Sequence, residues 1–206
     1  DGKHYLDRMV DASKRMRNLI DGLLSYSRVS RNALRFTVVD LSRIAHEAKS
    51  DLSQALQDTS GEIEIGELPS ITANETQIRQ LFQNLMANAL KFHKPNEPPR
   101  VRVEATVHKD AKSKSIVRPG AACEIRFSDD GIGFDPKYQN SIFQVFERLH
   151  GRNEYEGMGI GLAVCRKVAE RHGGTISAES EPGRGAVFTV ILPMEQPNTS
   201  SDKESE

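Results

Sequence analysis

The chain has 206 residues, enough to bury one α/β core with a small extension and too few for two full domains. Its 28 lysines and arginines balance 29 aspartates and glutamates, so no overall field favours nucleic acid, and we expect no nucleic-acid partner. Cys123 and Cys165 lack the spacing of a metal site or a disulfide framework. No apolar run approaches the about 20 residues of a membrane span. We therefore expect a soluble, cytoplasmic segment of a longer protein.

A long helix is predicted from Tyr5 to about Arg31. Apolar or small residues recur there in alternating steps of three and four, with charges between them, which is typical of a seam that packs against other helices. The seam consists of Leu6, Met9, Val10, Ser13, Met16, Ile20, Leu23, Leu24 and Ser27. Because this stripe is too narrow to bury itself, we predict that residues 1–34 belong to a helical-bundle dimerisation domain and form a homodimer. Docking on the chain's own domain is the alternative.

Residues 35–194 alternate between helical and strand patterns. Helices are predicted at 40–57, from 74 or 75 to the prolines at 95, 98 and 99, and at 159–172. Strands are predicted at 62–68, 101–107, 123–128, 175–179 and 186–192. The charged stretch 109–120 indicates a hairpin loop. Residues 195–206 are polar and without periodicity, so we predict a disordered tail.

Two asparagines and a lysine share one face of the helix that begins near residue 74. Asn84 and Asn88 are four residues apart, and Lys91 follows three residues later. Magnesium prefers hard oxygen ligands and commonly combines one or two protein oxygens with substrate phosphates. A neutral amide oxygen fits that role. The alternative is a pair of helix-interior asparagines that bond to the backbone.

Two glycine-rich segments follow. Asp129 precedes Gly131 and Gly133, where the absent side chains allow close backbone and ligand approach, and a carboxylate there accepts a hydrogen bond from an amine such as that of adenine. The run Gly157, Gly159 and Gly161 opens a helix whose amides and dipole favour phosphate. Its spacing differs from the dinucleotide-binding fingerprint and favours a mobile flap.

Three side chains lie between these glycine segments in the sequence. Arg148 is a candidate phosphate contact. Phe143 and Phe146 either anchor the flap or belong to the core; the sequence leaves both interpretations open.

In combination, these motifs resemble the N, G1, F, G2 and G3 boxes of the sensor histidine kinases of bacterial two-component systems. The matching motifs are the asparagine helix, Asp129-x-Gly131-x-Gly133, Phe143-x-x-Phe146, Gly157-x-Gly159-x-Gly161-Leu162 and Gly183-x-Gly185. The segment from Leu149 to Gly157 is similar to the phytochrome-like and PAS-linked branch. The resemblance implies an α+β fold, the two-layer Bergerat-type ATPase sandwich shared with gyrase, Hsp90 and MutL. It also implies that the first helix is the second helix of a dimerisation and phosphotransfer hairpin.

The resemblance further implies a protein-histidine kinase that uses ATP and Mg²⁺. Asn88 would hold the metal, Asn84 and Lys91 would contact the phosphates, and Asp129 would recognise adenine. The other nucleotide contacts implied are Gly131, Gly133, Gly157, Gly159, Gly161 and Leu162. The implied partners are a response-regulator receiver domain and an upstream sensor domain such as PAS.

The chain departs from the family pattern at the phosphoacceptor. Neither His4 nor His46 is followed by the acceptor sequence, so we expect the acceptor upstream of this segment. Met158 stands where threonine or serine is common. Two other functions are compatible with the motifs: an ATPase of the gyrase and Hsp90 type, and a non-enzymatic scaffold that binds nucleotide or a partner. Those ATPases place a water-activating glutamate where this chain has Asn84, which favours transfer over hydrolysis.

Overall fold

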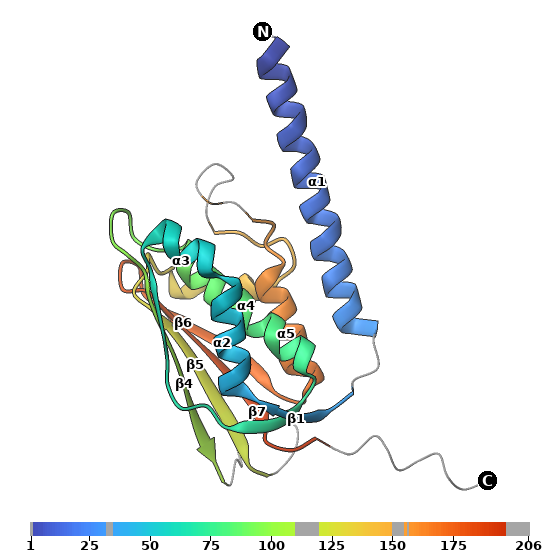
Figure 1. Ribbon diagram of the computed structural model, residues 1–206, viewed down its shortest axis with the longest axis vertical. Coiled ribbons are helices and arrows are strands. Elements are labelled where there is room, and N and C mark those ends of the chain that lie inside the picture. Colours follow the sequence, from blue (N-terminus) through green and yellow to red (C-terminus); the bar gives the residue numbers. More distant parts are fainter. Residues whose placement is uncertain (1, 32–34, 110–119, 150–154, 156, 197–206) are drawn as a thin grey trace, which may run out of the picture.

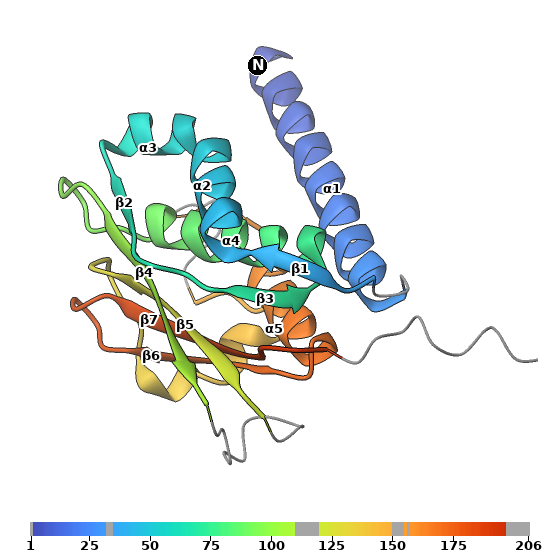
Figure 2. The ribbon, with the colours of Figure 1, turned by 60° about the horizontal axis from the view of Figure 1, so that its bottom comes forward.

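The computed structural model describes residues 2–31, 35–109, 120–149, 155 and 157–196. Its helices and strands, in chain order, are α1 (Gly2–Arg31), β1 (Thr37–Asp40), α2 (Leu41–Asp51), α3 (Ser53–Thr59), β2 (Glu62–Ile65), β3 (Ser70–Ala73), α4 (Glu75–Lys91), β4 (Arg100–His108), β5 (Ala122–Asp129), α5 (Gly161–Arg171), β6 (Thr175–Ser180) and β7 (Ala186–Pro193). Two short 3₁₀ turns, η1 (Pro136–Tyr138) and η2 (Ser141–Phe143), lie between β5 and α5. The elements after α1 form a two-layer sandwich, and α1 stands beside it (Figures 1 and 2).

The main sheet has five strands in the order β2-β4-β5-β7-β6. β2 runs parallel to β4, and all other neighbours are antiparallel. Along β4 the side chains alternate: Val101 and Val103 are buried, whereas Arg100 and Arg102 are exposed. This period of two directs one face of the sheet into the core and the other toward solvent.

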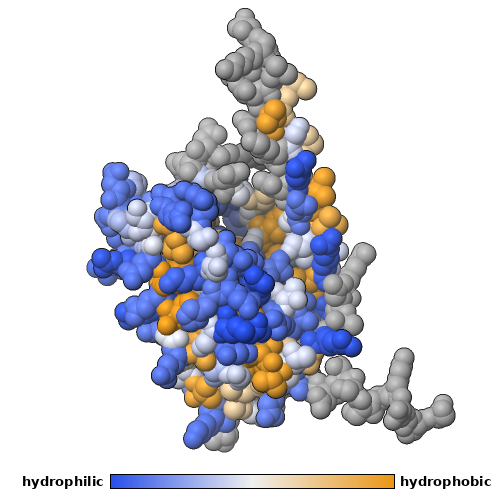
Figure 3. Space-filling model, viewed as in Figure 1, coloured by the Kyte–Doolittle hydropathy of each residue, from blue (hydrophilic) through white to orange (hydrophobic). Residues whose placement is uncertain are grey.

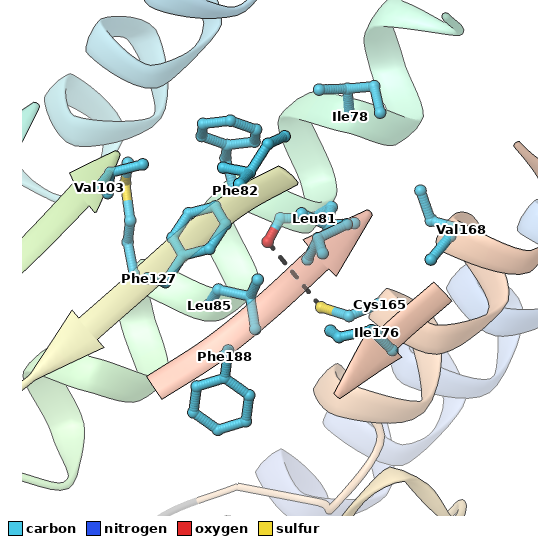
Figure 4. Close-up of a cluster of buried hydrophobic side chains, with 14 of the residues drawn as sticks. Ile78, Leu81, Phe82, Leu85, Val103, Phe127, Cys165, Val168, Ile176 and Phe188 are labelled. Carbon is cyan, nitrogen blue, oxygen red and sulfur yellow. Dashed lines mark hydrogen bonds between the residues drawn. The ribbon is translucent and has the colours of Figure 1, made fainter. Parts of the chain in front are cut away.

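Three helices, α2, α4 and α5, cover the buried face of the sheet. α4 begins at the N-cap Asn74, whose side chain accepts a hydrogen bond from the Gln77 N–H. Its apolar stripe packs on the sheet, where Phe82 meets Phe127 edge to face at 5.0 Å between ring centroids. The Cys165 thiol of α5 lies 3.9 Å from the Leu81 carbonyl oxygen of α4 (Figure 4). The core therefore fixes α4 and α5 against each other as well as against the sheet.

The structure differs from the sequence prediction at short elements. The helix predicted at 40–57 is two helices, because Leu52 leaves the helical conformation and its N–H bonds to the carbonyls of Lys49 and Ser50. The antiparallel pair β1–β3 was not predicted. Each of these strands has four residues, too few for alternation to separate them from a loop. The predicted tail, 195–206, lies outside the described residues from 197 onward, as does 110–119 of the predicted hairpin loop.

α1 has two contrasting faces. Its 30 residues span about 45 Å. Gly22, Ser25, Tyr26 and Val29 follow helical spacing and face the sandwich, where Val29 is buried. The opposite face carries exposed apolar side chains, visible along α1 in Figure 3. These are Met9, Val10, Met16, Ile20, Leu23 and Leu24. Within the described residues, no helix combines the length and apolarity needed to cross a bilayer.

Replacing Phe82 by alanine tests the packing between α4 and the sheet. Phe82 is fully buried, so the Phe82→Ala substitution should lower the free energy of unfolding by about 3–5 kcal/mol through lost apolar burial and a cavity. Urea denaturation followed by circular dichroism measures this change. Val38→Ala is the control, because Val38 is 78% exposed and its truncation should change the free energy by less than about 0.5 kcal/mol. Equal effects of the two substitutions would contradict this packing.

Candidate nucleotide-binding site

A cavity of about 360 Å³ lies between α4, α5 and the end of β5. α4 presents Gln80, Asn84, Asn88 and Lys91 to the cavity, because residues three and four apart share a helix face. Asp129, the last residue of β5, lines the same cavity. The structure thus brings together the amides and the carboxylate that the sequence places on separate elements.

Backbone amides hold the Asp129 carboxylate. Its Oδ1 accepts hydrogen bonds from the Gly131 N–H at 2.9 Å and from the Ala186 N–H at 3.2 Å. Burial raises the pKa of the Asp129 carboxyl to about 6, and these two hydrogen bonds act in the opposite direction. The nearby charge of Asp130 adds to the increase. The group is therefore a partly desolvated carboxylate at neutral pH, poised to accept a hydrogen bond from a ligand.

Glycines around Asp129 permit this arrangement. A Cβ at Gly185 would lie 1.9 Å from the Asp129 carbonyl oxygen, and the φ of Gly185 is +84°, which L side chains rarely adopt. A Cβ at Gly131 would lie 2.4 Å from the Phe92 carbonyl oxygen. Gly133 lines the cavity, whereas Gly131 is buried behind its wall, where the N–H serves Asp129. Gly131 therefore supports the site without facing it.

The second glycine run forms the opposite wall. Gly157, Gly159, Gly161 and Leu162 all line the cavity, and α5 begins at Gly161. The Asn84 amide donates to the Gly161 carbonyl at 3.3 Å, which ties α4 to the first residue of α5. Because the first amides of a helix lack intrahelical partners, this end of the cavity favours an anion.

Two cations approach the same wall. The Lys91 ammonium lies 4.4 Å from the centroid of the Phe92 ring, and a Cβ at Gly157 would lie 2.8 Å from its nitrogen. Arg148 lines the cavity and donates to the Tyr155 carbonyl at 2.7 Å. The absent side chain of Gly157 thus leaves space for the Lys91 ammonium, and Arg148 adds a second positive charge to the cavity lining.

The two phenylalanines of the F motif have different environments. Phe143 is buried and meets Phe188 edge to face at 6.4 Å, so it belongs to the core. Phe146 is 54% exposed with a φ of +70°, and its N–H donates to the Gly159 carbonyl at 2.9 Å. Among the described residues, Phe146 therefore contacts the glycine run through its backbone.

Sequence reasoning missed several wall residues. Gly22 and Ser25 of α1 line the cavity, and the Gln80 amide donates a hydrogen bond to the Ser25 hydroxyl. Gly22 allows this approach, because a Cβ there would lie 2.7 Å from the Ile160 side chain. An apolar slot next to Asp129 was also missed. It comprises Phe92, Ile132, Phe134, Ile142, Ala186 and Phe188.

The oxygen ligands in the cavity suit a hard cation that is coordinated by protein and phosphate oxygens together. No group of three or more histidines, cysteines, aspartates or glutamates that could hold a metal occurs among the described residues. Asn88 supplies a neutral amide oxygen, and one or two protein oxygens suffice for Mg²⁺ when phosphates and water complete its octahedron. The residues therefore fit a metal that arrives with its ligand.

Comparison with known proteins decides the family. Residues 73–196 match the family of histidine kinase-, DNA gyrase B- and HSP90-like ATPases. The chain belongs to this family. The matched segment contains every motif residue from Asn84 to Gly185, which confirms the resemblance found in the sequence and the α+β ATPase fold.

Two curated relatives extend the likeness to α1. The phytochrome-like protein Cph1 of Synechocystis sp. is 35% identical over 194 residues, which cover 94% of this chain and 24% of Cph1. The circadian input-output histidine kinase CikA of Synechococcus elongatus is 30% identical over 202 residues, covering 93% of this chain and 25% of CikA. The chain thus spans about a quarter of the length of these relatives.

A solved structure supports the fold independently. Full-length ShkA in complex with AMPPNP aligns with a TM-score of 0.72 and 23% identity, covering 95% of this chain and 39% of that chain. At this identity, the likeness establishes the fold.

Asp129→Asn tests the cost of the buried carboxylate. Asparagine keeps an oxygen for both N–H donors and removes the charge. A raised pKa means that the folded protein binds the proton more tightly than the unfolded chain, so wild-type stability should gain a contribution as pH falls from about 6 to about 4. The variant should lack this contribution and be about 1–3 kcal/mol more stable near neutral pH.

Urea denaturation at several pH values measures this difference. Asp58→Asn, on exposed α3, removes the same charge without burial and serves as the control. If Asp129→Asn and the wild type showed identical pH profiles, the carboxylate would not be desolvated as described.

Proposed function

We propose that this chain is the ATP-binding catalytic portion of a sensor histidine kinase, which transfers the γ-phosphoryl group of Mg·ATP to a histidine outside this chain. The observation that carries the proposal is the shared cavity of Asn88 and Asp129, one suited to a metal and the other to a base. Membership of the ATPase family and likeness to a histidine kinase support it.

The Asp129 end accommodates the base. Its carboxylate accepts a hydrogen bond from the exocyclic amine of adenine, whereas guanine presents a carbonyl oxygen at that position and is repelled. The apolar side chains of Ile132, Phe134 and Phe188 shield the adenine ring from water. A single buried acceptor in an apolar slot therefore selects adenine.

The phosphates lie toward α5. Lys91, Arg148 and the free amides at the start of α5 neutralise their charge, and Asn84 orients this end through its bond to Gly161. Asn88 would hold Mg²⁺, which draws charge from the phosphate oxygens when bound. Gly133, Gly157, Gly159 and Leu162 shape the wall, and Gly131 supports it from behind.

Transfer is favoured over hydrolysis. Asn84 cannot take a proton from water, and it occupies the position at which the resemblance implies a catalytic glutamate in gyrase and Hsp90. In the proposed reaction, a bond forms between an imidazole nitrogen and the γ-phosphorus, while the bond from that phosphorus to the β–γ bridging oxygen breaks and ADP leaves. An aspartate of a response-regulator receiver domain then accepts the phosphoryl group.

The partners follow from the same proposal. The exposed apolar face of α1 binds a second copy of this chain in a helical bundle. An upstream sensor domain, such as PAS, acts through α1. Because the reaction uses ATP, we assign the segment to the cytoplasm.

Asn88→Ala tests the metal assignment. The substitution should lower the affinity for ATP in the presence of Mg²⁺ by at least about tenfold, 1.4 kcal/mol, and leave the affinity in excess EDTA unchanged. Transfer from γ-labelled ATP to a separately supplied acceptor-helix dimer should disappear. Calorimetry and autoradiography measure the two effects, and Asn140→Ala, at an exposed position that does not line the cavity, is the control. Unchanged transfer would remove Asn88 from the metal site.

Leu23→Glu tests the dimer. Leu23 is exposed on the apolar face of α1, and a carboxylate there would be desolvated in a helical bundle. The variant should sediment as a monomer at concentrations where the wild type is a dimer, with ATP affinity unaltered. Arg28→Glu is the control: it lies at an exposed position at the side of the apolar face, changes the charge more than Leu23→Glu does, and should remain dimeric. A dimeric Leu23→Glu protein would place the dimer contact elsewhere.

A further inference from the structure

His172 is buried at the end of α5 and fixed in one neutral form. Its side chain has no exposed surface. Nδ1 lies 2.8 Å from the Val168 carbonyl oxygen, and Nε2 accepts from the Asn74 backbone N–H at 3.0 Å. Because a carbonyl only accepts and an amide N–H only donates, the proton is on Nδ1 and the lone pair is on Nε2.

Electrostatics around His172 favour the neutral ring. Burial lowers the pKa of His172, the Val168 carbonyl acts in the opposite direction, and the charge of Arg171 lowers the pKa further. The other described groups that contact His172 are uncharged: the Asn74 backbone N–H and the Phe36 ring at the imidazole, and the Gln196 amide at the His172 carbonyl. The imidazole therefore acts as a permanent hydrogen-bond acceptor.

Asn74 connects this acceptor to the segment that follows α1. As the N-cap of α4, its Oδ1 accepts from the Gln77 N–H at 3.0 Å. Its Nδ2 donates to the Arg35 carbonyl at 3.2 Å. One residue thus links the start of α4, the end of α5 and the connection between α1 and β1.

Further contacts close the same junction. The Phe36 ring lies edge-on to the imidazole, 5.5 Å away at 72°. The Arg171 guanidinium donates to the Val29 carbonyl in the last turns of α1. The Gln196 amide donates to the His172 carbonyl at 2.6 Å. We call this set the His172 junction: Val29, Arg35, Phe36, Asn74, Arg171, His172 and Gln196.

The His172 junction lies away from the cavity but on the helices that frame it. α5 runs from Gly161, at the cavity, to the junction. Asn84 lies roughly 15 Å along α4 from Asn74, at about 1.5 Å per residue. None of the junction residues lines the cavity. Their contacts therefore act on the placement of the helices and of α1, not on a ligand.

We propose that His172 is a positioning residue whose neutral imidazole holds the connection after α1 against the ends of α4 and α5, and so fixes the orientation of the ATPase sandwich relative to α1. The importance of His172 for phosphoryl transfer rests on the proposed function, in which α1 belongs to the helical-bundle dimer and the γ-phosphoryl group is transferred to a histidine outside this chain. Its effect on the placement of α1 does not.

A distance measurement between α1 and the sheet tests this proposal. Spin labels on Arg17→Cys and Ser177→Cys, both exposed, report the distance by pulsed electron resonance. Cys123 and Cys165 are buried, and burial raises the pKa of each thiol to about 12, so they should not react. Dilution with unlabelled protein removes distances between subunits. The affinity for Mg·AMPPNP is measured on the same samples.

Two substitutions separate the acceptor from the bulk of the ring. In His172→Gln the amide oxygen replaces Nε2 as an acceptor, so the distance distribution should stay as narrow as in the parent. In His172→Phe an aromatic ring remains but the acceptor is lost, so the distance distribution should widen about twofold or more. The Kd for Mg·AMPPNP should change by less than about threefold. Asn74→Asp keeps the helix cap and turns the donor to Arg35 into an acceptor, so it should widen the distribution as well.

Two results of the distance measurements would contradict the role of His172. Parent-like distributions in both His172→Phe and Asn74→Asp would overturn the proposal, and so would equal widening in His172→Gln and His172→Phe. If His172→Phe lost nucleotide binding through misfolding, Asn74→Asp alone would decide. None of these measurements requires phosphoryl transfer, so failure here is distinguishable from failure of the proposed function.

Discussion

The site depends on one constraint, the placement of a carboxylate in a partly buried slot. Asp129 ends a strand whose neighbours close around it, and two backbone N–H groups replace part of the water it loses. Its pKa of about 6 shows that this replacement is incomplete. Steric packing by itself requires glycine at 185 and 131, because a Cβ at either position would clash with the backbone carbonyl oxygen of Asp129 or of Phe92. The carboxylate thus lowers stability at neutral pH and remains in the cavity as a hydrogen-bond acceptor.

The two ends of the cavity use different chemistry. In the proposed arrangement, the end that takes the base has one charged acceptor among apolar side chains, and leaving that acceptor unpaired would cost free energy with the wrong base. The other end has neutral amides, two cations and a helix start, which suit a triphosphate with its metal. α4 joins these ends, because Asn84, Asn88 and Lys91 share the face of α4 that lines the cavity. α1 contributes Gly22 and Ser25 to the edge of the cavity.

Local signals in the sequence predicted the long strands, α4, α5 and the cavity residues that belong to the asparagine and glycine motifs. The N-cap, the two-residue alternation and the glycine spacing are all encoded over a few residues. The break at Leu52, the β1–β3 pair and the approach of Gly22 to Ile160 depend on contacts between distant segments, which no local pattern reveals. The same holds for Gly131, which resembles the cavity-lining Gly133 in sequence but does not line the cavity itself. Phe143 and Phe146 are alike in the motif and differ only in tertiary environment.

The central claim is that Asn88 and Asp129 contact opposite ends of one nucleotide. A crystal structure of the chain with Mg·AMPPNP tests it most directly. The account predicts the Asn88 amide oxygen at about 2.1 Å from the magnesium ion. It also predicts the Asp129 carboxylate within hydrogen-bond distance of the adenine amine in the same molecule. A nucleotide bound with its base toward α5, or with either side chain turned out of the cavity, would contradict it.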